Sequence, residues 1–417
     1  MKTFLSLSFL LLFWAHSQAQ NEAYARRLID TLTSEALGGR GYYQDGANKA
    51  AELLKNEFVN AELLPVSKNY FQDFNIPINC ITGKPSVKLN GKALRPGRDF
   101  LIGRNSPTVS GHFEVKILNK KPAKLDSLIV LSQKKDYSDN FILTGNKDRI
   151  LNNQNIFGAA GLIMIVDDLW WHVSNGYEVM DIPVIKIHRD AIPSLPETIE
   201  VDIENKFYDA YATKNVAAMI EGTEFPDQYI LITAHYDHLG RMGDEVYFPG
   251  AHDNASGTAM MTDLARHFSQ NPPPASIVFI AFGAEETGLD GSSFYADNPL
   301  IPLEKTLFSV NLDIIGSGST GITVVNGAVL PEYFGLLKEI NRKNNYVPAV
   351  KERGEAAISD HYPLYQKGVP AFFIYTTGDE YQEYHSVTDK AEGLPLTAYD
   401  RLFRLVHDFV LQIPTKK

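Results

Sequence analysis

The stretch IVFIAFGAEETGLDGS, residues 277–292, holds the pattern that decides the fold. Its first part, Ile277–Phe282, is an uninterrupted apolar run, which predicts a strand buried on both faces. Gly283 ends the run, and Glu285 and Glu286 then stand side by side. Two neighbouring carboxylates at the mouth of a buried strand repel each other, so this position needs either solvent or a cation.

Apolar strands alternate with helices on both sides of this stretch. From about residue 213, the predicted strands are 215–222, 229–237, 276–283, 307–316 and 370–377, and the predicted helices are 255–268, 331–343 and 397–412. This alternation predicts an α/β fold with a mostly parallel central sheet flanked by helices. Ligands of such sheets bind beyond the carboxyl ends of the strands, so polar residues there are the first candidates for chemistry.

The N-terminal half has a different texture. Residues 22–62 are predicted to be helical, whereas the region from 80 to 210 reads as β-rich, with a hairpin turn at Asn90–Gly91. The strands predicted in that region are 127–132, 159–168, 182–188 and 198–203, with one helical segment at about 152–160. We therefore predict an α/β domain formed by residues 20–80 and 211–417, interrupted by an inserted β-rich domain at 81–210.

The first residues, MKTFLSLSFLLLFWAHSQAQ, have the pattern of a secretory signal peptide, which we place at residues 1–19. This predicts export to the periplasm or the exterior. No later segment has the roughly 18 uninterrupted apolar residues of a membrane span, so no stable membrane insertion is expected. Cys80 is the only cysteine, which excludes an intrachain disulfide and a thiolate metal cluster. The net charge of −11 argues against nucleic-acid binding.

Four predicted strand ends carry acidic or histidine side chains. These residues are His235, Asp237 and His238 after the first strand, Glu285 and Glu286 after the second, then Asp313 and His385. Asp253 lies between the first two sets, just before a predicted helix, where it could simply cap that helix. Each residue alone could also be an ordinary surface side chain, but several carboxylates gathered at one edge need a cation to offset their repulsion.

Two histidines and three carboxylates are a ligand set that suits zinc. Five candidate ligands exceed what a single zinc needs, so the set indicates two ions about 3.5–4 Å apart that share one carboxylate. Asp253 is the natural bridge, because it lies in a loop after the first strand and at the start of a helix. Asp237, two residues after His235, is expected to support that histidine rather than bind a metal. His238 and His252 are left without a role.

Six motifs in order resemble the M28 family of zinc aminopeptidases. They are AHYDHLG, PGAHDNASG, FGAEETGLDGS, NLDIIG, SDHYPLYQKGVPA and YHSVTD, which together span about residues 233–389. The segment LTSEALGGRGYYQDGANKAAELL, residues 32–54, is similar to the opening helix of that family. The resemblance implies that His235 and Asp313 hold one zinc, that Glu286 and His385 hold the other, and that Asp253 bridges them.

The same resemblance assigns the chemistry. It implies that Glu285 is the general base and that Tyr384 hydrogen-bonds the oxyanion, as a tyrosine does in some members. It also implies a cis peptide bond between Asp253 and Asn254. The segments NIFGAAGLIMIVDD and IPVIKIHRDA resemble the protease-associated domain often inserted in this family. Trp170 and Trp171, which follow one of these segments, could line the substrate path, pack in a core or form a surface patch.

The expected protein is thus an exported di-zinc aminopeptidase acting on peptides with a free N-terminus. One alternative is a glutaminyl cyclase, a single-zinc acyltransferase on a similar scaffold. A second is a non-enzymatic relative, which typically lacks metal ligands that are all present here. A third is a carboxypeptidase, which needs an arginine in the site to bind the substrate carboxylate, and Arg241 and Arg353 are the candidates. Oligomeric state and the preferred N-terminal residue do not follow from the sequence.

Overall fold

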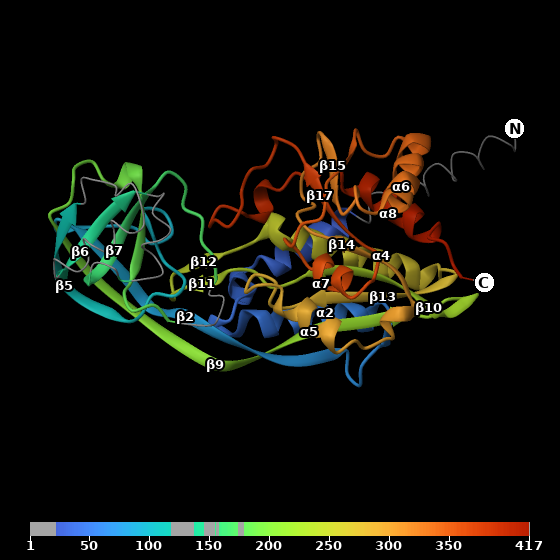
Figure 1. The fold of residues 1–417 in the computed structure, drawn as a ribbon, viewed down its shortest axis with the longest axis horizontal. Helices are drawn as coiled ribbons and strands as arrows, with labels where there is room; N and C mark the ends of the chain where they lie inside the picture. Colours follow the sequence, from blue (N-terminus) through green and yellow to red (C-terminus); the bar gives the residue numbers. More distant parts are fainter. Residues whose placement is uncertain (1–21, 118–136, 146–154, 156–157, 174–178, 417) are drawn as a thin grey trace, which may run out of the picture.

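A computed structural model describes the chain except for residues 1–21, 118–136, 146–154, 156–157, 174–178 and 417 (Figure 1). The predicted signal peptide and the predicted strand at 127–132 lie outside the described residues. Within the described part, none of the helices combines the length and the apolar character needed to cross a bilayer.

The larger lobe is built on a seven-stranded part of the main sheet. Its strands are β9 (Thr198–Ile220), β10 (Phe225–His235), β13 (Ala275–Phe282), β14 (Thr306–Leu312), β15 (Gly321–Val325), β16 (Val350–Glu352) and β17 (Ala371–Thr377), in the order β16-β15-β17-β14-β10-β13-β9. The central pairs β13–β10, β10–β14 and β14–β17 are parallel, while β9 and β15 pair antiparallel with their neighbours β13 and β17. The predicted α/β fold with a mostly parallel central sheet is therefore confirmed.

Alternate residues of the central strands feed two separate cores, because successive side chains of a strand point to opposite faces. In β13, Ile277 and Phe279 belong to one apolar cluster, while Val278 and Ile280 belong to the other. Helices α2 (Gly46–Asn60), α4 (Ser256–Gln270), α6 (Pro331–Asn344) and α8 (Tyr399–Leu411) cover the first face, and α5 (Asp290–Asp297) and α7 (His361–Gln366) cover the second. Each large apolar side chain buried this way contributes about 1.5–3 kcal/mol.

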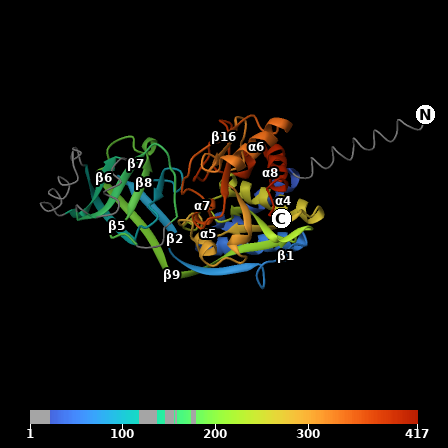
Figure 2. The same ribbon diagram turned by 45° about the vertical axis from the view of Figure 1, so that its right-hand side comes forward.

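The smaller lobe is an extension of the same sheet. Besides parts of β9, it contains β2 (Phe71–Leu89), β3 (Lys92–Ala93), β4 (Phe100–Ile102), β5 (Val109–Ile117), β6 (Tyr137–Gly145), β7 (Ala159–Val166) and β8 (Val184–His188). Strands β2 and β9 pair antiparallel from Phe71↔Val216 to Leu89↔Ile199 and run from one lobe into the other (Figures 1 and 2). Positions 81 and 210, predicted as the edges of the inserted domain, thus fall inside two long strands.

Of three local predictions for the N-terminal half, one is confirmed and two differ from the structure. The Asn90–Gly91 turn joins β2 to β3 as a hairpin, as expected. The region 22–62 is not one helix, because a helix over 22–32 is separated from α2 by 3₁₀ turns in which Gly38 and Gly39 have positive φ. A Cβ at Gly39 would lie 2.4 Å from the Phe248 carbonyl oxygen, so this turn packs too closely against the neighbouring backbone for a residue with a side chain. Of the helix predicted near 152–160, the end is instead the start of β7, and the rest lies mostly outside the described residues.

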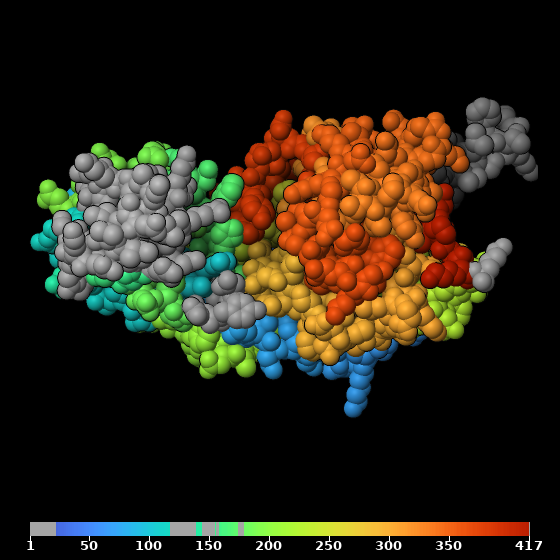
Figure 3. Space-filling model, viewed as in Figure 1, coloured from blue at the N-terminus to red at the C-terminus, as the bar shows by residue number. Residues whose placement is uncertain are grey.

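Three short strands remain among the described residues. Strand β1 (Leu64–Pro65) pairs with β9, and β11 (Gly240–Met242) pairs with β12 (Val246–Phe248) in a separate hairpin. In Figure 3, green atoms of the smaller lobe lie against red atoms of the chain that follows β17, where the two lobes meet. This junction matters for the site described next, because one predicted metal ligand lies on it.

Candidate metal centre

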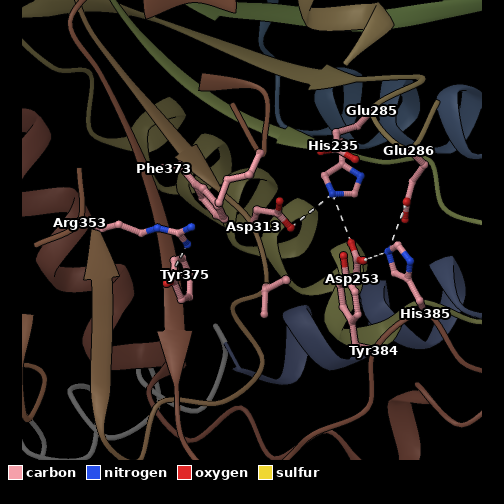
Figure 4. A pocket seen from close by; sticks show the side chains of 12 residues that line it. His235, Asp253, Glu285, Glu286, Asp313, Arg353, Phe373, Tyr375, Tyr384 and His385 are labelled. Carbon is pink, nitrogen blue, oxygen red and sulfur yellow. Dashed lines mark hydrogen bonds and ion pairs between the residues drawn. The ribbon is translucent and has the colours of Figure 1, made fainter. Parts of the chain in front are cut away.

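The five predicted metal ligands lie around one pocket at the carboxyl ends of the strands (Figure 4). His235 ends β10, Asp313 directly follows β14, and Glu286 lies in the turn after β13. Asp253 lies in the turn before α4, and His385 lies in the loop that follows β17. The parallel strands bring these distant residues together because their carboxyl ends share one edge of the sheet.

The ligand atoms form two groups that meet at Asp253. His235 Nε2 lies 3.3 Å from Asp253 Oδ1 and 3.3 Å from Asp313 Oδ1. His385 Nε2 lies 3.0 Å from Asp253 Oδ2 and 3.3 Å from Glu286 Oε2. Each oxygen of Asp253 therefore faces a different group, which is the arrangement expected of a bridging carboxylate.

The electrostatics of the pocket favour a bound cation. Burial alone would lower the pKa of His235, but the carboxylates of Asp313 and Glu285 raise it well above its usual value. Burial likewise opposes the charge on His385, yet Glu286 and Asp253 raise its pKa to about 9. Buried histidines become this basic only in a strongly negative potential. Nitrogen and carboxylate donors in such a potential fit divalent zinc.

Asp237 lies next to His235 but holds a different part of the site. The nearest Asp237 atom to His235 Nδ1 is the backbone oxygen at 3.2 Å, while carboxylate Oδ1 is 3.8 Å away. Asp237 Oδ1 accepts the backbone N–H of Glu285 at 3.1 Å, and Oδ2 accepts that of Glu286 at 3.3 Å. The Tyr42 hydroxyl also donates to Oδ2, at 3.0 Å. This buried carboxylate thus anchors the two adjacent glutamates by their main chain.

A chain of buried hydrogen bonds orients Asp313. The Ser359 hydroxyl donates to Asp313 Oδ2 at 2.8 Å, which leaves Oδ1 facing His235. Asn311 donates to the Ser359 oxygen at 2.8 Å and accepts from the Thr233 hydroxyl at 2.8 Å. Such outer partners fix the direction of a ligand oxygen.

Asp253 is held through its backbone. The Asp389 carboxylate accepts the N–H groups of His252 at 2.8 Å and of Asp253 at 3.2 Å. The fully buried Arg40 donates to the backbone oxygens of Gly250 at 2.8 Å and of Asp253 at 3.3 Å. The Asp253–Asn254 peptide bond is cis, as the resemblance implied.

Three residues at or close to ligand positions have left-handed backbone conformations. Ala284, Ile314 and His385 have φ values of 59°, 57° and 49°. This conformation costs about 1–3 kcal/mol for a non-glycine residue, most of all for a β-branched one such as Ile314. The backbone oxygen of Ile314 accepts bonds from the N–H and the hydroxyl of Thr376, at 3.0 and 2.9 Å. These bonds hold the strained turn that directs the Ile314 side chain into the pocket.

Glu285 and Tyr384 line the same pocket, beside the metal-ligand groups. Burial raises the pKa of Glu285 well above its usual value, and the neighbouring carboxylates of Asp360 and Glu286 add to the effect while His235 opposes it. A carboxylate in this setting binds a proton readily. Burial also raises the pKa of the Tyr384 phenol, whose ring stacks on His385 with centroids 3.9 Å apart. This phenol therefore keeps its proton and can donate a hydrogen bond.

Two histidines without a sequence-based role have distinct contacts. His238 is fully buried, and its Nδ1 lies 2.7 Å from Glu286 Oε1 and 4.0 Å from Asp253 Oδ2. A hydrogen bond from His238 to Oε1 leaves Glu286 Oε2 facing His385, so His238 orients the ligand. His252 Nδ1 instead accepts the backbone N–H of Gly316 at 3.0 Å, a structural contact.

The smaller lobe contributes a contact to the site that the sequence could not reveal. The backbone oxygen of Trp171 lies 3.0 Å from His385 Nδ1, and the backbone N–H of Trp171 donates to the His385 backbone oxygen at 2.9 Å. The buried Trp171 indole stacks on Phe248 with centroids 4.7 Å apart. Of the three alternatives considered for this residue, packing in a core therefore fits. Trp170 is 50% exposed and lies edge-on to the Tyr384 ring, 6.1 Å between centroids.

Of the two candidate arginines, Arg353 lines the pocket, whereas Arg241 lies away from it and bonds the backbone oxygens of Glu35 and Asp244. Three of the supporting residues could have been found from the sequence, because they lie inside the motifs that resemble the M28 family: His238, Ser359 and Asp389. The contact between the backbone oxygen of Trp171 and His385 could not be predicted in this way, because no motif includes Trp171.

Comparison with known sequences gives a family match. Residues 215–410 match the model described as peptidase family M28. Aminopeptidase YwaD of Bacillus subtilis strain 168 is 29% identical over 234 residues, which cover 51% of this chain and 47% of that protein. A probable zinc metalloprotease of Pyricularia oryzae is 44% identical over 112 residues, 26% of this chain and 22% of that protein. The chain thus spans about half, or less, of the length of the curated relatives it matches.

Comparison with solved structures covers nearly the whole chain. A zinc aminopeptidase from Bacillus subtilis superposes with a TM-score of 0.70 at 21% identity, covering 93% of this chain and 94% of that one. A peptidase M28 precursor from Shewanella amazonensis superposes with a TM-score of 0.70 at 18% identity, covering 96% and 99%. These matches extend over both lobes and show that the fold is shared.

Proposed function

Since residues 215–410 belong to peptidase family M28, we propose that this protein is an exported zinc aminopeptidase with a two-zinc centre. The observation that carries the proposal is the arrangement of two nitrogen-and-carboxylate groups that share Asp253. His235 and Asp313 would hold one ion, and His385 and Glu286 the other.

When bound, the two ions supply Lewis-acid activation of the scissile carbonyl and of a water molecule. Glu285, beside both ligand groups, takes the proton from that water and passes it to the departing amine. Tyr384 donates a hydrogen bond to the oxyanion, a role its raised pKa permits because the phenol stays protonated. Asp237 accepts hydrogen bonds from the backbone N–H groups of Glu285 and Glu286 and so holds the two glutamates in the positions that their different roles require.

The substrate class follows from the donors and acceptors at the proposed metal centre. A peptide's free amino group can offer its nitrogen lone pair to a zinc ion and its N–H groups to the carboxylates that line the pocket. In an N-blocked peptide this nitrogen is an amide without a free lone pair, so the proposal distinguishes sharply between the two. Hydrolysis of a leucyl anilide and failure to hydrolyse its N-acetylated form is the expected result.

The decisive experiment combines metal analysis with a base variant. The purified protein should contain about two zinc ions per chain, because a co-catalytic centre of this type holds two ions. Glu285→Gln should retain the zinc and lose turnover by several orders of magnitude, because it removes the proton acceptor but no ligand. Glu304→Gln, an exposed glutamate after α5, serves as the matched control and should keep full activity. Turnover by Glu285→Gln close to wild type contradicts the base role.

Zinc stoichiometry also separates this proposal from the single-zinc glutaminyl cyclase. One zinc per chain together with release of a cyclised N-terminus from a glutaminyl peptide would favour the cyclase. Export rests on the N-terminal sequence alone, and N-terminal sequencing of the mature protein tests it. A mature chain that begins near residue 20 is the expected outcome.

A further inference from the structure

The pocket has a second wall opposite the metal ligands, with a single cationic side chain. This wall is formed by Ile314, Arg353, Ile358, Phe373 and Tyr375, and the whole pocket has a volume of about 300 Å³. Since a water molecule occupies about 30 Å³ in the liquid, the space is large enough for an amino-acid side chain as well as the reacting groups. In Figure 4, Arg353 extends toward Tyr375 on the side of the pocket away from His385.

The backbone of Arg353 is fixed while its guanidinium has few partners. The Arg353 N–H donates to the Val324 oxygen at 2.9 Å, and the Ala328 N–H donates to the Arg353 oxygen at 3.2 Å. The side chain makes one long contact, 3.5 Å from Nη1 to the Tyr375 hydroxyl. Among the residues that the structure describes, no carboxylate forms an ion pair with it. Most of its five N–H donors are therefore available to a ligand in the pocket.

The balance of charge around the pocket indicates what kind of group Arg353 binds. With two divalent ions bound, the carboxylates of Asp253, Glu285, Glu286 and Asp313 are ionised, and their four negative charges equal the charge of the ions. The guanidinium is then the uncompensated charge of the pocket. A planar guanidinium binds a carboxylate through two parallel hydrogen bonds, which makes the carboxylate its preferred partner.

We propose that Arg353 is a specificity-determining residue that binds the side-chain carboxylate of an N-terminal glutamate or aspartate. The substrate's amino group lies by the metal-binding carboxylates, so the side chain of the same residue extends along the neighbouring wall. Phe373 and Tyr375 lie two residues apart on β17, on the same face, and contact the aliphatic part of that side chain. Arg353 then receives its end. This inference rests on the aminopeptidase activity proposed above.

The test compares glutamyl and glutaminyl anilides, which differ in charge but hardly in shape. The zinc-loaded wild type should hydrolyse the glutamyl anilide with the higher kcat/KM. Arg353→Met should lower kcat/KM for the glutamyl anilide by about tenfold to a hundredfold, the range for losing a hydrogen-bonded charge partner. It should change the glutaminyl and leucyl values by no more than about twofold, since neither substrate carries the charge that this contact recognises. Arg353→Lys should recover part of the preference.

A matched control and a binding measurement separate recognition from general charge. Lys351→Met removes an exposed positive charge two residues away and should leave the glutamyl-to-glutaminyl ratio unchanged. Calorimetric titration should show that free glutamate, a reaction product, binds the wild type more tightly than glutamine does, and that Arg353→Met abolishes the difference.

Three results overturn the inference in distinguishable ways. Equal loss on all anilides in Arg353→Met, or a wild type that prefers the glutaminyl substrate, removes Arg353 from side-chain recognition. Release of the C-terminal residue from an N-acetylated peptide, lost in Arg353→Met, assigns the arginine to a C-terminal carboxylate instead. A zinc-loaded wild type that hydrolyses none of the anilides refutes the proposed function itself.

Discussion

Replacing Asp237 by asparagine tests how the paired glutamates are positioned. The Asp237 carboxylate accepts three hydrogen bonds, from the backbone N–H groups of Glu285 and Glu286 and from the Tyr42 hydroxyl. Asparagine has nearly the same shape but offers one oxygen and one NH₂ group. Whichever way the amide turns, a donor must face a donor in a fully buried position.

The magnitude follows from counting these contacts. In the better orientation, the amide oxygen keeps the bonds from Glu286 and Tyr42, and the NH₂ group faces the Glu285 N–H. One unpaired buried donor costs about 1–3 kcal/mol, and the two remaining bonds lose the strengthening that a charged acceptor gives. Part of this cost is offset because a buried charge has been removed. A net loss of about 3 kcal/mol in positioning corresponds to about a hundredfold in kcat/KM.

The assay measures kcat/KM on a leucyl anilide together with zinc affinity, because Glu285 and Glu286 have different proposed roles. Asp237→Asn should lower kcat/KM by about a hundredfold and weaken zinc binding by about tenfold to a hundredfold. Tyr42→Phe is the matched control, since it removes one donor but leaves both backbone bonds, and it should cost no more than about fivefold in kcat/KM. If Asp237→Asn and Tyr42→Phe have equal and small effects on both quantities, the anchoring argument is wrong.

Three further outcomes are expected. Removing zinc with a chelator should lower the thermal midpoint, since ligand at a thousand times its Kd stabilises by about 4 kcal/mol per site, and adding zinc back should restore it in a calorimetric scan. Trp171→Ala should destabilise the fold by about 3–5 kcal/mol and weaken zinc binding through His385, whereas Trp171→Phe, which keeps a ring against Phe248, should retain most of both in denaturant titration and zinc titration. Burial raises the pKa of Asp263 to about 7 in the folded chain, so the stability that its protonation contributes is fully present below about pH 4 and is lost as pH rises through 7. Asp263→Asn should remove this contribution and flatten the thermal-midpoint profile between about pH 4 and 7 relative to wild type, and parallel profiles would contradict the assignment.

The sequence was sufficient for β10, β13, β14 and β17 of the central sheet because their signals are local, but it did not predict the short strands β15 and β16. Runs such as Ile277–Phe282 are apolar throughout, and their strand character follows from a few consecutive residues. Sequence could not place the ends of the smaller lobe, because β2 and β9 continue through the predicted boundaries. Nothing in the composition at positions 81 or 210 distinguishes a strand that stays in one lobe from a strand that spans two.

For the candidate site, too, the sequence predicted some features and left others undecided. Residue type and position at strand ends, or at a helix start for Asp253, selected His235, Asp253, Glu286, Asp313 and His385, and the structure brings all five around one pocket. The resemblance, rather than the spacing, distinguished Glu285 from Glu286. The hydrogen bonds that Asp237 accepts from the two backbone N–H groups give a physical reason why the two side chains stay in separate positions.

By itself, the sequence determined the chemistry available to this protein: histidines and carboxylates at the carboxyl ends of strands in an α/β fold. Only the tertiary structure decided which other groups act on them. His385 meets the backbone oxygen of Trp171, 214 residues away, and Arg353 lies across the pocket from the metal ligands. Every residue has a backbone oxygen, and an exposed arginine is common, so neither contact could be predicted from the sequence. Both arise because the sheet and the smaller lobe bring together segments that lie far apart along the chain.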